Sequence, residues 1–161
     1  MIQNYCNECG GKLYLMDLDK EGLVPFCKNC QKFKFPTYNV AVSMIVKYKD
    51  QILLIKQYGN PFYILVAGYV NIKEPLEDAC KRELKEEMNL DALKVVFNRS
   101  KYYEKSDTLM VNFTVEVSDI SNIKNNEEVD SYNWFSKEEA LKNIKENSLA
   151  KYFLTEYLNS I

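Results

Sequence analysis

The sequence contains no histidine, and this absence removes several reaction classes at once. Ser-His-Asp and Cys-His catalysis, HExxH metal sites and histidine ligation of zinc are all excluded. Acid–base chemistry must therefore fall to Asp, Glu, Lys, Tyr, Cys or water. Arginine is almost as scarce, because Arg82 and Arg99 are the two arginines among 21 basic residues. An arginine kept inside a glutamate-rich stretch, as Arg82 is, indicates that its planar, bidentate fork is needed there.

Other absences concern the surroundings in which the chain works. No apolar run approaches the roughly 20 residues that a membrane helix requires, and the first residues, MIQNYC, do not resemble a signal peptide. The net charge of −2 creates no basic field for nucleic acid or an anionic membrane. We therefore expect a cytoplasmic protein. Its 161 residues, 47% of them hydrophobic, suffice for one domain or for a small module plus a domain.

Four of the five cysteines form two CxxC pairs separated by 17 residues: Cys6, Cys9, Cys27 and Cys30. This spacing is typical of a four-thiolate zinc site, and the segments Lys12–Asp17 and Leu23–Phe26 have the composition of a ribbon hairpin. A module of 36 residues buries too little surface to fold alone, so bound zinc would stabilise it. We predict a structural zinc ribbon at residues 1–36. The fifth cysteine, Cys80, is expected to belong to the core.

Two alternatives to a structural zinc ribbon concern the same residues. The cysteines could form two disulfides or stay as free thiols, although the chain has no export signal. The ribbon could instead bind nucleic acid, but residues 1–36 carry five lysines against four acids, which is a poor footprint for phosphate. Nucleic acid is therefore not expected as a partner.

From residue 37 onward, apolar patterns predict strands before and after a central helix. The predicted strands are Thr37–Tyr48, Gln51–Tyr58, Phe62–Ala67, Leu93–Tyr103, Thr108–Val117 and Glu128–Phe135. The predicted helices are Pro75–Asn89, a short helix opened by a capping box at Ser136, and Ser148–Leu158. This order predicts an α+β domain at residues 37–161, built as an α/β/α sandwich with a sheet between helices.

The helix from Pro75 to Asn89 carries acidic residues on an unusual side. At about 100° per residue, Glu83 and Glu87 fall on the same side as the apolar residues, and Glu86 lies at the edge of that side. Like charges that lean toward a buried face repel one another and are costly to desolvate. A cation is therefore expected there, most simply a divalent metal held by oxygen ligands.

The stretch from Gly68 to Leu90 resembles the Nudix box, GX5EX7REUXEEXGU. The matching fixed positions are Gly68, Glu74, Arg82, Glu83, Glu86 and Glu87. The one departure is Asn89, which stands where the box has its last Gly. Asn tolerates a left-handed backbone better than most residues, so we expect the helix end to stay intact. The resemblance implies the Nudix fold and hydrolysis of a diphosphate.

The resemblance extends to zinc-ribbon Nudix proteins typified by the NAD(H) diphosphatases. As in that group, two CxxC pairs precede the first strand, and Glu128 lies six residues before Trp134 in an E-x5-W-F pattern. Residues 100–110 depart from the group's S-Q-P-W-P-F-P-x-S-L-M, because the prolines and Phe are missing and Tyr103 replaces the Trp. The resemblance therefore implies a nucleoside diphosphate linked to another group, such as NADH, ADP-ribose or a nucleotide sugar, and a homodimer.

The resemblance also implies roles in the reaction, in which water attacks one phosphorus with Mg²⁺ or Mn²⁺ as the catalytic metal. Glu83 and Glu87 would share a metal ion, and the carbonyl of Ala67 would complete part of its shell. Glu86 would hold a second metal or polarise the water. Glu128 would be the general base or a further ligand, although an ordinary surface acid is its alternative.

Three fixed positions of the box are expected to be structural: Gly68, Glu74 and Arg82. Arg82 would pair with Glu74 or Glu86. The tyrosines put forward for base stacking are Tyr103, Tyr69 and Tyr38, each with core or rim packing as its alternative. A catalytically silent Nudix domain that acts as a nucleotide sensor or partner-binding module is the competing function. The retained carboxylates argue against it, because a sensor would not need them.

Overall fold

The computed structural model describes residues 3–160, and the chain divides into two compact units, Met1–Tyr38 and Asn39–Ile161. This division falls close to the expected boundary after residue 36. The identity of residues 1–36 as a zinc ribbon and of 37–161 as a hydrolase domain stays a prediction. No helix in the described part of the chain is long and apolar enough to cross a membrane.

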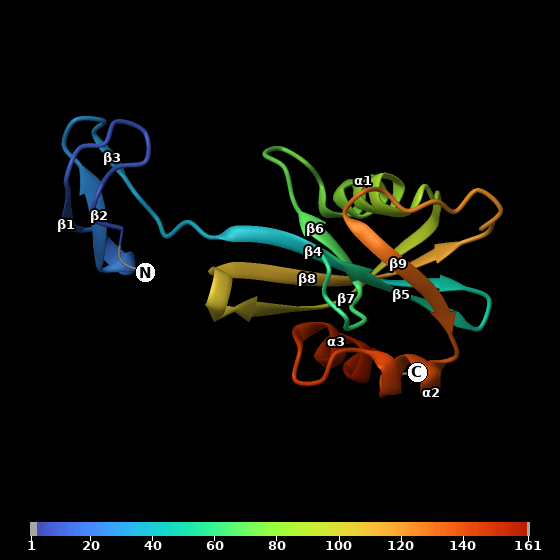
Figure 1. Ribbon diagram of the computed structural model, residues 1–161. Coiled ribbons are helices and arrows are strands. Elements are labelled where there is room, and N and C mark those ends of the chain that lie inside the picture. The colour runs from blue at the N-terminus through green and yellow to red at the C-terminus, as the bar shows by residue number, and fades with distance from the viewer. Residues whose placement is uncertain (1–2, 161) are drawn as a thin grey trace. The chain divides into compact units, whose positions relative to one another are not determined.

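The first unit is a small antiparallel sheet with strand order β1-β2-β3 (Figure 1). Its elements are β1 (Leu13–Asp17), η1 (Asp19–Glu21), β2 (Leu23–Cys27) and β3 (Lys32–Phe33). The buried residues of its core are Cys6, Leu13 and Cys27, with Cys30 packed against them. Such a small apolar core cannot offset the entropy lost on folding, so a cross-link or a metal ion is needed at the cysteines.

The second unit is a mixed sheet with helices on both faces (Figure 1). Its strands are β4 (Asn39–Tyr48), β5 (Gln51–Gln57), β6 (Val66–Tyr69), β7 (Ala92–Tyr103), β8 (Thr108–Val117) and β9 (Val129–Phe135). Its helical elements are α1 (Leu76–Met88), η2 (Glu104–Ser106), α2 (Lys137–Asn143) and α3 (Leu149–Leu158). The sheet runs in the order β7-β8-β4-β5-β9, and β4 and β8 are its parallel pair. The predicted α+β sandwich is confirmed.

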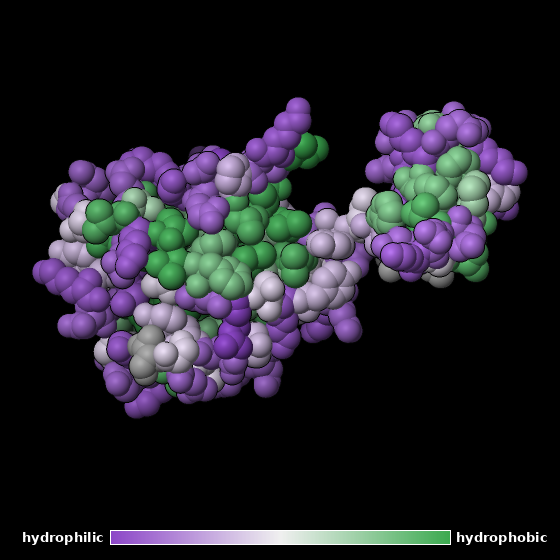
Figure 2. All heavy atoms as spheres, turned by 180° about the vertical axis from the view of Figure 1, so that it is seen from behind, coloured by the Kyte–Doolittle hydropathy of each residue, from purple (hydrophilic) through white to green (hydrophobic). Residues whose placement is uncertain are grey.

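Strand alternation divides the interior into two cores, because successive side chains of a strand point to opposite faces. On β5, Leu53 and Ile55 belong to the core that contains Leu84 of α1. Ile52 and Leu54 belong to the core that contains Phe153 of α3. Some apolar side chains lie outside both cores and gather on the surface (Figure 2). The sheet therefore needs both helical layers, and α1 is held on one face by its apolar side.

The ends of α1 follow from single residues. Pro75 is the N-cap, one residue before the helix begins, with an extended ψ of 147°. Asn89 is the C-cap and adopts the left-handed conformation, with φ 52° and ψ 35°, while its backbone N–H donates to the carbonyl of Lys85. This is the conformation for which the Nudix box has Gly at the corresponding position. The expected intact helix end is therefore present.

The strand expected at Phe62–Ala67 lies later, because β6 spans Val66–Tyr69. Ile64 instead exchanges two backbone hydrogen bonds with Ile55, at 3.0 and 2.9 Å, before β6 begins. β6 then pairs with the first half of β4, whereas β5 pairs with β4 at Lys47 and Tyr48. The sheet therefore opens between β5 and β6, beside the second half of α1.

Candidate active site

A cavity of about 540 Å³ lies where the sheet opens between β5 and β6. Its lining includes the four glutamates expected at the site: Glu83, Glu86, Glu87 and Glu128. Gly68, Ala67, Tyr69 and Arg82 also line it. The fold thus brings α1, β6 and the segment before β9 to one hollow. Ala41 and Met110 add apolar surface to the lining.

Glu83 and Gly68 are in direct contact across the α1–β6 interface. A β-carbon at position 68 would lie 1.9 Å from Cδ of Glu83 and 2.1 Å from its Oε1. Gly68 pairs with Val42 of β4, so the sheet holds its backbone in place against Glu83. Position 68 therefore requires Gly because the Glu83 carboxylate occupies the space of a β-carbon. The backbone at Gly68 does not have a positive φ, so conformational freedom is not the reason.

Arg82 holds three of the carboxylates. Its Nε and Nη2 form a bidentate pair with Glu74 at 2.7 and 2.9 Å. Its Nη1 donates to Glu83 at 2.7 Å and to Glu86 at 3.1 Å. Its Nη2 also donates to the carbonyl of Tyr69 at 2.9 Å. All five N–H groups of the guanidinium are therefore used, and the expected choice between Glu74 and Glu86 resolves into contacts with both.

Glu74 anchors the loop that leads into α1. Besides the bidentate pair with Arg82, it accepts the backbone N–H of Asn71 at 2.8 Å. The Arg82 hydrogen bonds lower the pKa of Glu74 to about 2, with a further contribution from the Asn71 N–H. The carboxylate is thus firmly ionised, and it fixes the loop on the helix through charge-assisted bonds.

Glu87 is the most unusual group of the site. Its side chain is buried, at 4% exposure, and its Oε2 has no hydrogen-bond partner among the described residues. Burial raises the pKa of Glu87 to about 8, and the nearby charge of Glu83 adds to the rise, while a hydrogen bond from Gln57 opposes it. A buried carboxylate with an unpaired oxygen is costly without a cation.

Glu128 reaches the cavity from outside α1, just before β9. The hydroxyl of Tyr58 donates to Oε2 of Glu128 at 2.6 Å, and this bond raises the pKa of Tyr58 to about 12. Tyr58 has a φ of 53°, which is a strained conformation for an aromatic residue. Strain of this kind is frequent at functional sites. Tyr58 was missed from the sequence, because nothing in the local pattern marks the residue that directly follows β5.

The three tyrosines expected to stack on a base occupy different places. Tyr69 lines the cavity and is exposed. Tyr103 ends β7 and is absent from the lining of this cavity. Tyr38 ends the first unit and is exposed. Of the three, Tyr69 is therefore the one that the fold brings to the glutamates.

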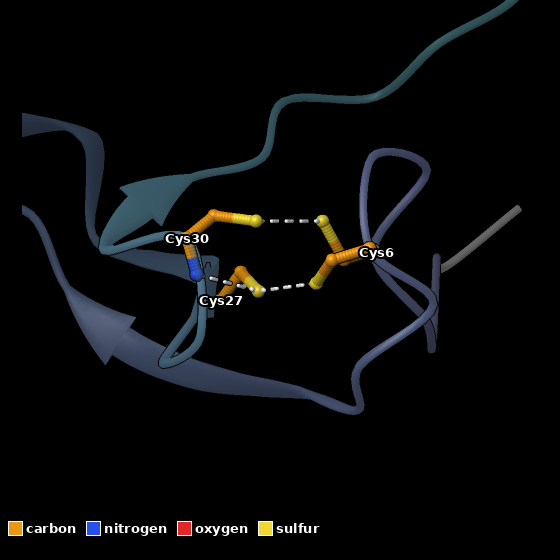
Figure 3. Close-up of side chains that lie close together, drawn as sticks. Cys6, Cys27 and Cys30 are labelled. Carbon is orange, nitrogen blue, oxygen red and sulfur yellow. Dashed lines mark hydrogen bonds between the residues drawn. The ribbon is translucent and has the colours of Figure 1, made fainter.

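The four ribbon cysteines form a separate cluster. Their sulfur atoms all lie within 4.8 Å of one another. The distances are 3.8 Å from Cys6 to Cys30 and 3.5 Å from Cys9 to Cys27. Figure 3 shows the thiols of Cys6, Cys27 and Cys30 pointing toward one another. Zinc with bonds of about 2.3 Å to sulfur would separate its ligands by about 3.8 Å in a tetrahedron, so the cluster fits zinc.

Backbone and charged groups also surround the thiols. The N–H of Glu8 donates to Cys6 and the N–H of Cys30 donates to Cys27, each at 3.4 Å. Lys34 is nearly buried and pairs with Glu8 at 2.7 Å. Among residues 3–160, no other set of three or more Cys, Asp or Glu gathers its ligand atoms as closely. The carboxylate oxygens of the cavity glutamates are therefore spread more widely than the four sulfur atoms.

Comparison with known proteins agrees with this geometry. The family model described as the NUDIX domain matches residues 37–157. The NAD-capped RNA hydrolase NudC of Photobacterium profundum is 25% identical over 158 residues, which cover 97% of this chain and 58% of that protein. The protein of the same name from Vibrio cholerae is 25% identical over 160 residues, covering 98% and 58%. The chain thus spans little more than half the length of these curated relatives.

Solved structures show the same fold at low sequence identity. A NUDIX hydrolase from Nitrosomonas europaea superposes with a TM-score of 0.69 at 20% identity, covering 98% of this chain and 92% of that one. An Ap4A hydrolase from C. elegans, solved as a binary complex, gives a TM-score of 0.62 at 18% identity, covering 74% and 96%. With the matched family model and the cavity lined by the box glutamates, these findings show that the chain belongs to the NUDIX family.

Proposed function

We propose that the chain catalyses metal-dependent hydrolysis of the diphosphate bond in a nucleoside diphosphate linked to a second group. The observation that carries this proposal is the buried, unpaired Oε2 of Glu87 in a cavity that it shares with Glu83, Glu86 and Glu128. Four acidic groups around one hollow repel an anionic substrate unless cations intervene. A metal–diphosphate complex satisfies both the carboxylates and the substrate.

The residues of the cavity fit a divalent cation. Glu83 and Glu87 lie one turn apart on α1 and would hold it, with the carbonyl of Ala67 as a further oxygen donor. Glu86 is more exposed and would bind a second cation or orient water. Mg²⁺ or Mn²⁺ bound there would neutralise the carboxylates and stabilise charge on the non-bridging oxygens of the diphosphate.

The chain's own residues supply the rest of the chemistry. Glu128 is our candidate to accept the proton of the attacking water, whose oxygen forms a bond to one phosphorus while the bridging P–O bond breaks. Tyr58 orients one oxygen of Glu128 through its hydroxyl and leaves the other available. Arg82 keeps Glu83 and Glu86 in place with its short, charge-assisted bonds. In this proposal the chain's residues accelerate the reaction mainly by positioning the reacting groups and by stabilising charge.

For the substrate, we propose an NADH-like or ADP-ribose-like dinucleotide or a nucleotide sugar. Tyr69, Ala41 and Met110 offer an aromatic and apolar surface beside the glutamates, where a nucleoside can pack. The curated relatives are named as hydrolases of NAD-capped RNA, and such a cap contains a diphosphate of this class. The weak positive charge of residues 1–36 favours the small dinucleotide over a long RNA.

For the first unit, we propose one structural Zn²⁺ ion bound by the four cysteines. The sulfur–sulfur distances and the N–H groups directed at Cys6 and Cys27 support it. Formation of a homodimer, which the resemblance to zinc-ribbon Nudix proteins implies, stays a prediction that light scattering coupled to gel filtration would test.

The test is a panel of NADH, NAD⁺, ADP-ribose, nucleotide sugars and NAD-capped RNA, with identification of the products. We expect mononucleotide release that requires Mg²⁺ or Mn²⁺ and disappears with EDTA. Glu87→Gln should lower turnover by a factor on the order of 10² or more, since it removes a charged metal ligand. Nucleotide binding in magnesium without turnover of any compound would favour the sensor instead.

A further inference from the structure

The segment 118–128, which connects β8 to β9, delivers Glu128 to the cavity and docks on the C-terminal end of α1. A helix leaves its last four carbonyls without partners inside the helix. Here the N–H of Lys124 donates to the carbonyl of Met88 at 3.0 Å, and the N–H of Asn126 donates to that of Glu87 at 3.1 Å. Figure 1 shows the segment before β9 beside α1. The helix end is thus completed by the segment that carries Glu128.

Asn89 adds a side-chain bond to the same junction. Its Nδ2 donates to the carbonyl of Asn122 at 2.9 Å, while its backbone stays left-handed at φ 52°. A Gly at this position would keep the backbone conformation but could not make the bond. The departure from the Nudix box therefore introduces a third tie between α1 and segment 118–128.

Asn126 couples the position of Glu128 to that of α1 through hydrogen bonds. Its backbone N–H binds the carbonyl of Glu87, the residue whose side chain lies buried in the cavity. Its Oδ1 accepts the N–H of Glu128 at 3.0 Å and that of Val129 at 3.2 Å. One residue therefore links the backbones of two acids that face the same hollow from separate elements.

We propose that Asn89 and Asn126 are positioning residues that clamp segment 118–128 onto the end of α1 and so set the place of Glu128 in the cavity. The inference rests on the proposed hydrolysis for its kinetic consequences, whereas the clamp itself can be measured without substrate. Neither residue touches the reacting atoms. Both act through the backbone of the segment that ends in Glu128.

The first experiment compares Asn89→Gly with Asn147→Gly in the full-length chain. Asn147 has the same φ of 52° but lies before α3, so its replacement is a matched control for placing Gly at a left-handed Asn. We expect Asn89→Gly to lower kcat about fivefold, the effect of one neutral hydrogen bond, with a smaller change in KM. Amide exchange at Lys124 should become faster. Asn147→Gly should change neither.

The second experiment examines Asn126, whose side chain serves two N–H groups. Asn126→Ala removes the acceptor and should lower kcat about tenfold or more, while Asn126→Asp keeps the acceptor and should recover most of the activity. In a Glu128→Gln background, Asn126→Ala should have little further effect on kcat, because its role is exercised through Glu128. A purely structural role would lower kcat equally in both backgrounds.

The outcomes separate the clamp from the function. If wild-type protein hydrolyses nothing in the panel, the proposed function fails, and amide exchange at Lys124 still decides whether the clamp exists. If wild type is active but Asn89→Gly equals Asn147→Gly in kcat and exchange, the role of Asn89 is overturned. Equal losses from Asn126→Ala with and without the Glu128→Gln change would overturn the role of Asn126.

Discussion

The carboxylate of Glu83 lies against the α-carbon of Gly68, so that a β-carbon at position 68 would lie 1.9 Å from Cδ of Glu83. Glu83 is also bonded to Arg82 at 2.7 Å, and its side chain is only 13% exposed. The carboxylate is therefore confined from two sides. The glycine of β6 and the glutamate of α1, 15 positions apart, form one fitted contact at the cavity.

Gly68→Ala should displace the Glu83 carboxylate and lower the proposed hydrolase activity by a factor on the order of 10², since misplacement of about 1 Å has effects of that size. The fold should persist, because the displaced group is the end of a side chain. Steady-state kinetics and circular dichroism measure the two effects. Gly22→Ala is the control for backbone strain outside the cavity lining: its β-carbon would meet no atom within 4 Å, although the φ of 70° disfavours it, and hydrolysis should be unchanged. Equal activity of Gly68→Ala and wild type would contradict the fitted contact.

Glu87→Gln should stabilise the metal-free protein while it removes activity. Burial raises the pKa of Glu87 to about 8, so the folded state binds its proton more tightly than the unfolded state does. The stability of the metal-free wild type therefore falls as pH rises from about 4.5 to about 8, by several kcal/mol in order of magnitude. Urea unfolding in EDTA at pH 5 and pH 8.5 should show this fall in wild type and its absence in Glu87→Gln.

Added Mg²⁺ or Mn²⁺ should reverse this ranking, because a cation compensates the buried charge of Glu87 and binds the folded state alone. The melting temperature of wild type should rise with metal concentration, and that of Glu87→Gln should rise less. Differential scanning fluorimetry at pH 8 measures both. A metal response of equal size in the two proteins would mean that Glu87 is not a ligand.

Glu74→Gln should destabilise the protein in a pH-dependent manner. The pKa of Glu74 is lowered to about 2 by the hydrogen bonds from Arg82, below its ordinary value of 4.5. Its contribution is therefore fully present above about pH 4.5 and is lost as pH falls through about 2. The difference in unfolding free energy between wild type and Glu74→Gln should be largest at pH 7 and shrink toward pH 2. A constant difference would contradict the ionised pair with Arg82.

Cys27→Ser should abolish zinc binding and unfold the first unit without melting the second. Cys27 is fully buried, and its sulfur lies 3.5 Å from that of Cys9. Small zinc modules depend on the metal for their folding free energy. Zinc content by mass spectrometry should fall from one ion per chain to none, while the core amides of β4 and β8 stay protected from exchange. Cys80→Ser, outside the cluster, should keep the zinc. Retained zinc in Cys27→Ser would contradict the four-thiolate site.

Local patterns in the sequence were sufficient for most of the elements and for the box. The spacing of apolar residues predicted α1 within a residue at each end, since helix period and helix caps are local properties. Ser136 forms the expected capping box with Glu139. The four cysteines meet as their spacing predicted, because each CxxC turn is local and the short β1–β2 hairpin brings the two turns together. The strand at Phe62–Ala67 was misplaced, because β6 is defined by its pairing with β4.

The sequence by itself determined the NUDIX box, the acidic face of α1 and the cysteine spacing, because each of these depends on residues close together in the chain. Only the tertiary structure decided which distant groups complete the site. Tyr58 meets Glu128 across 70 positions, and Asn89 binds the carbonyl of Asn122 across 33. Such contacts depend on where the sheet opens and where segment 118–128 docks on α1, and no local periodicity encodes either.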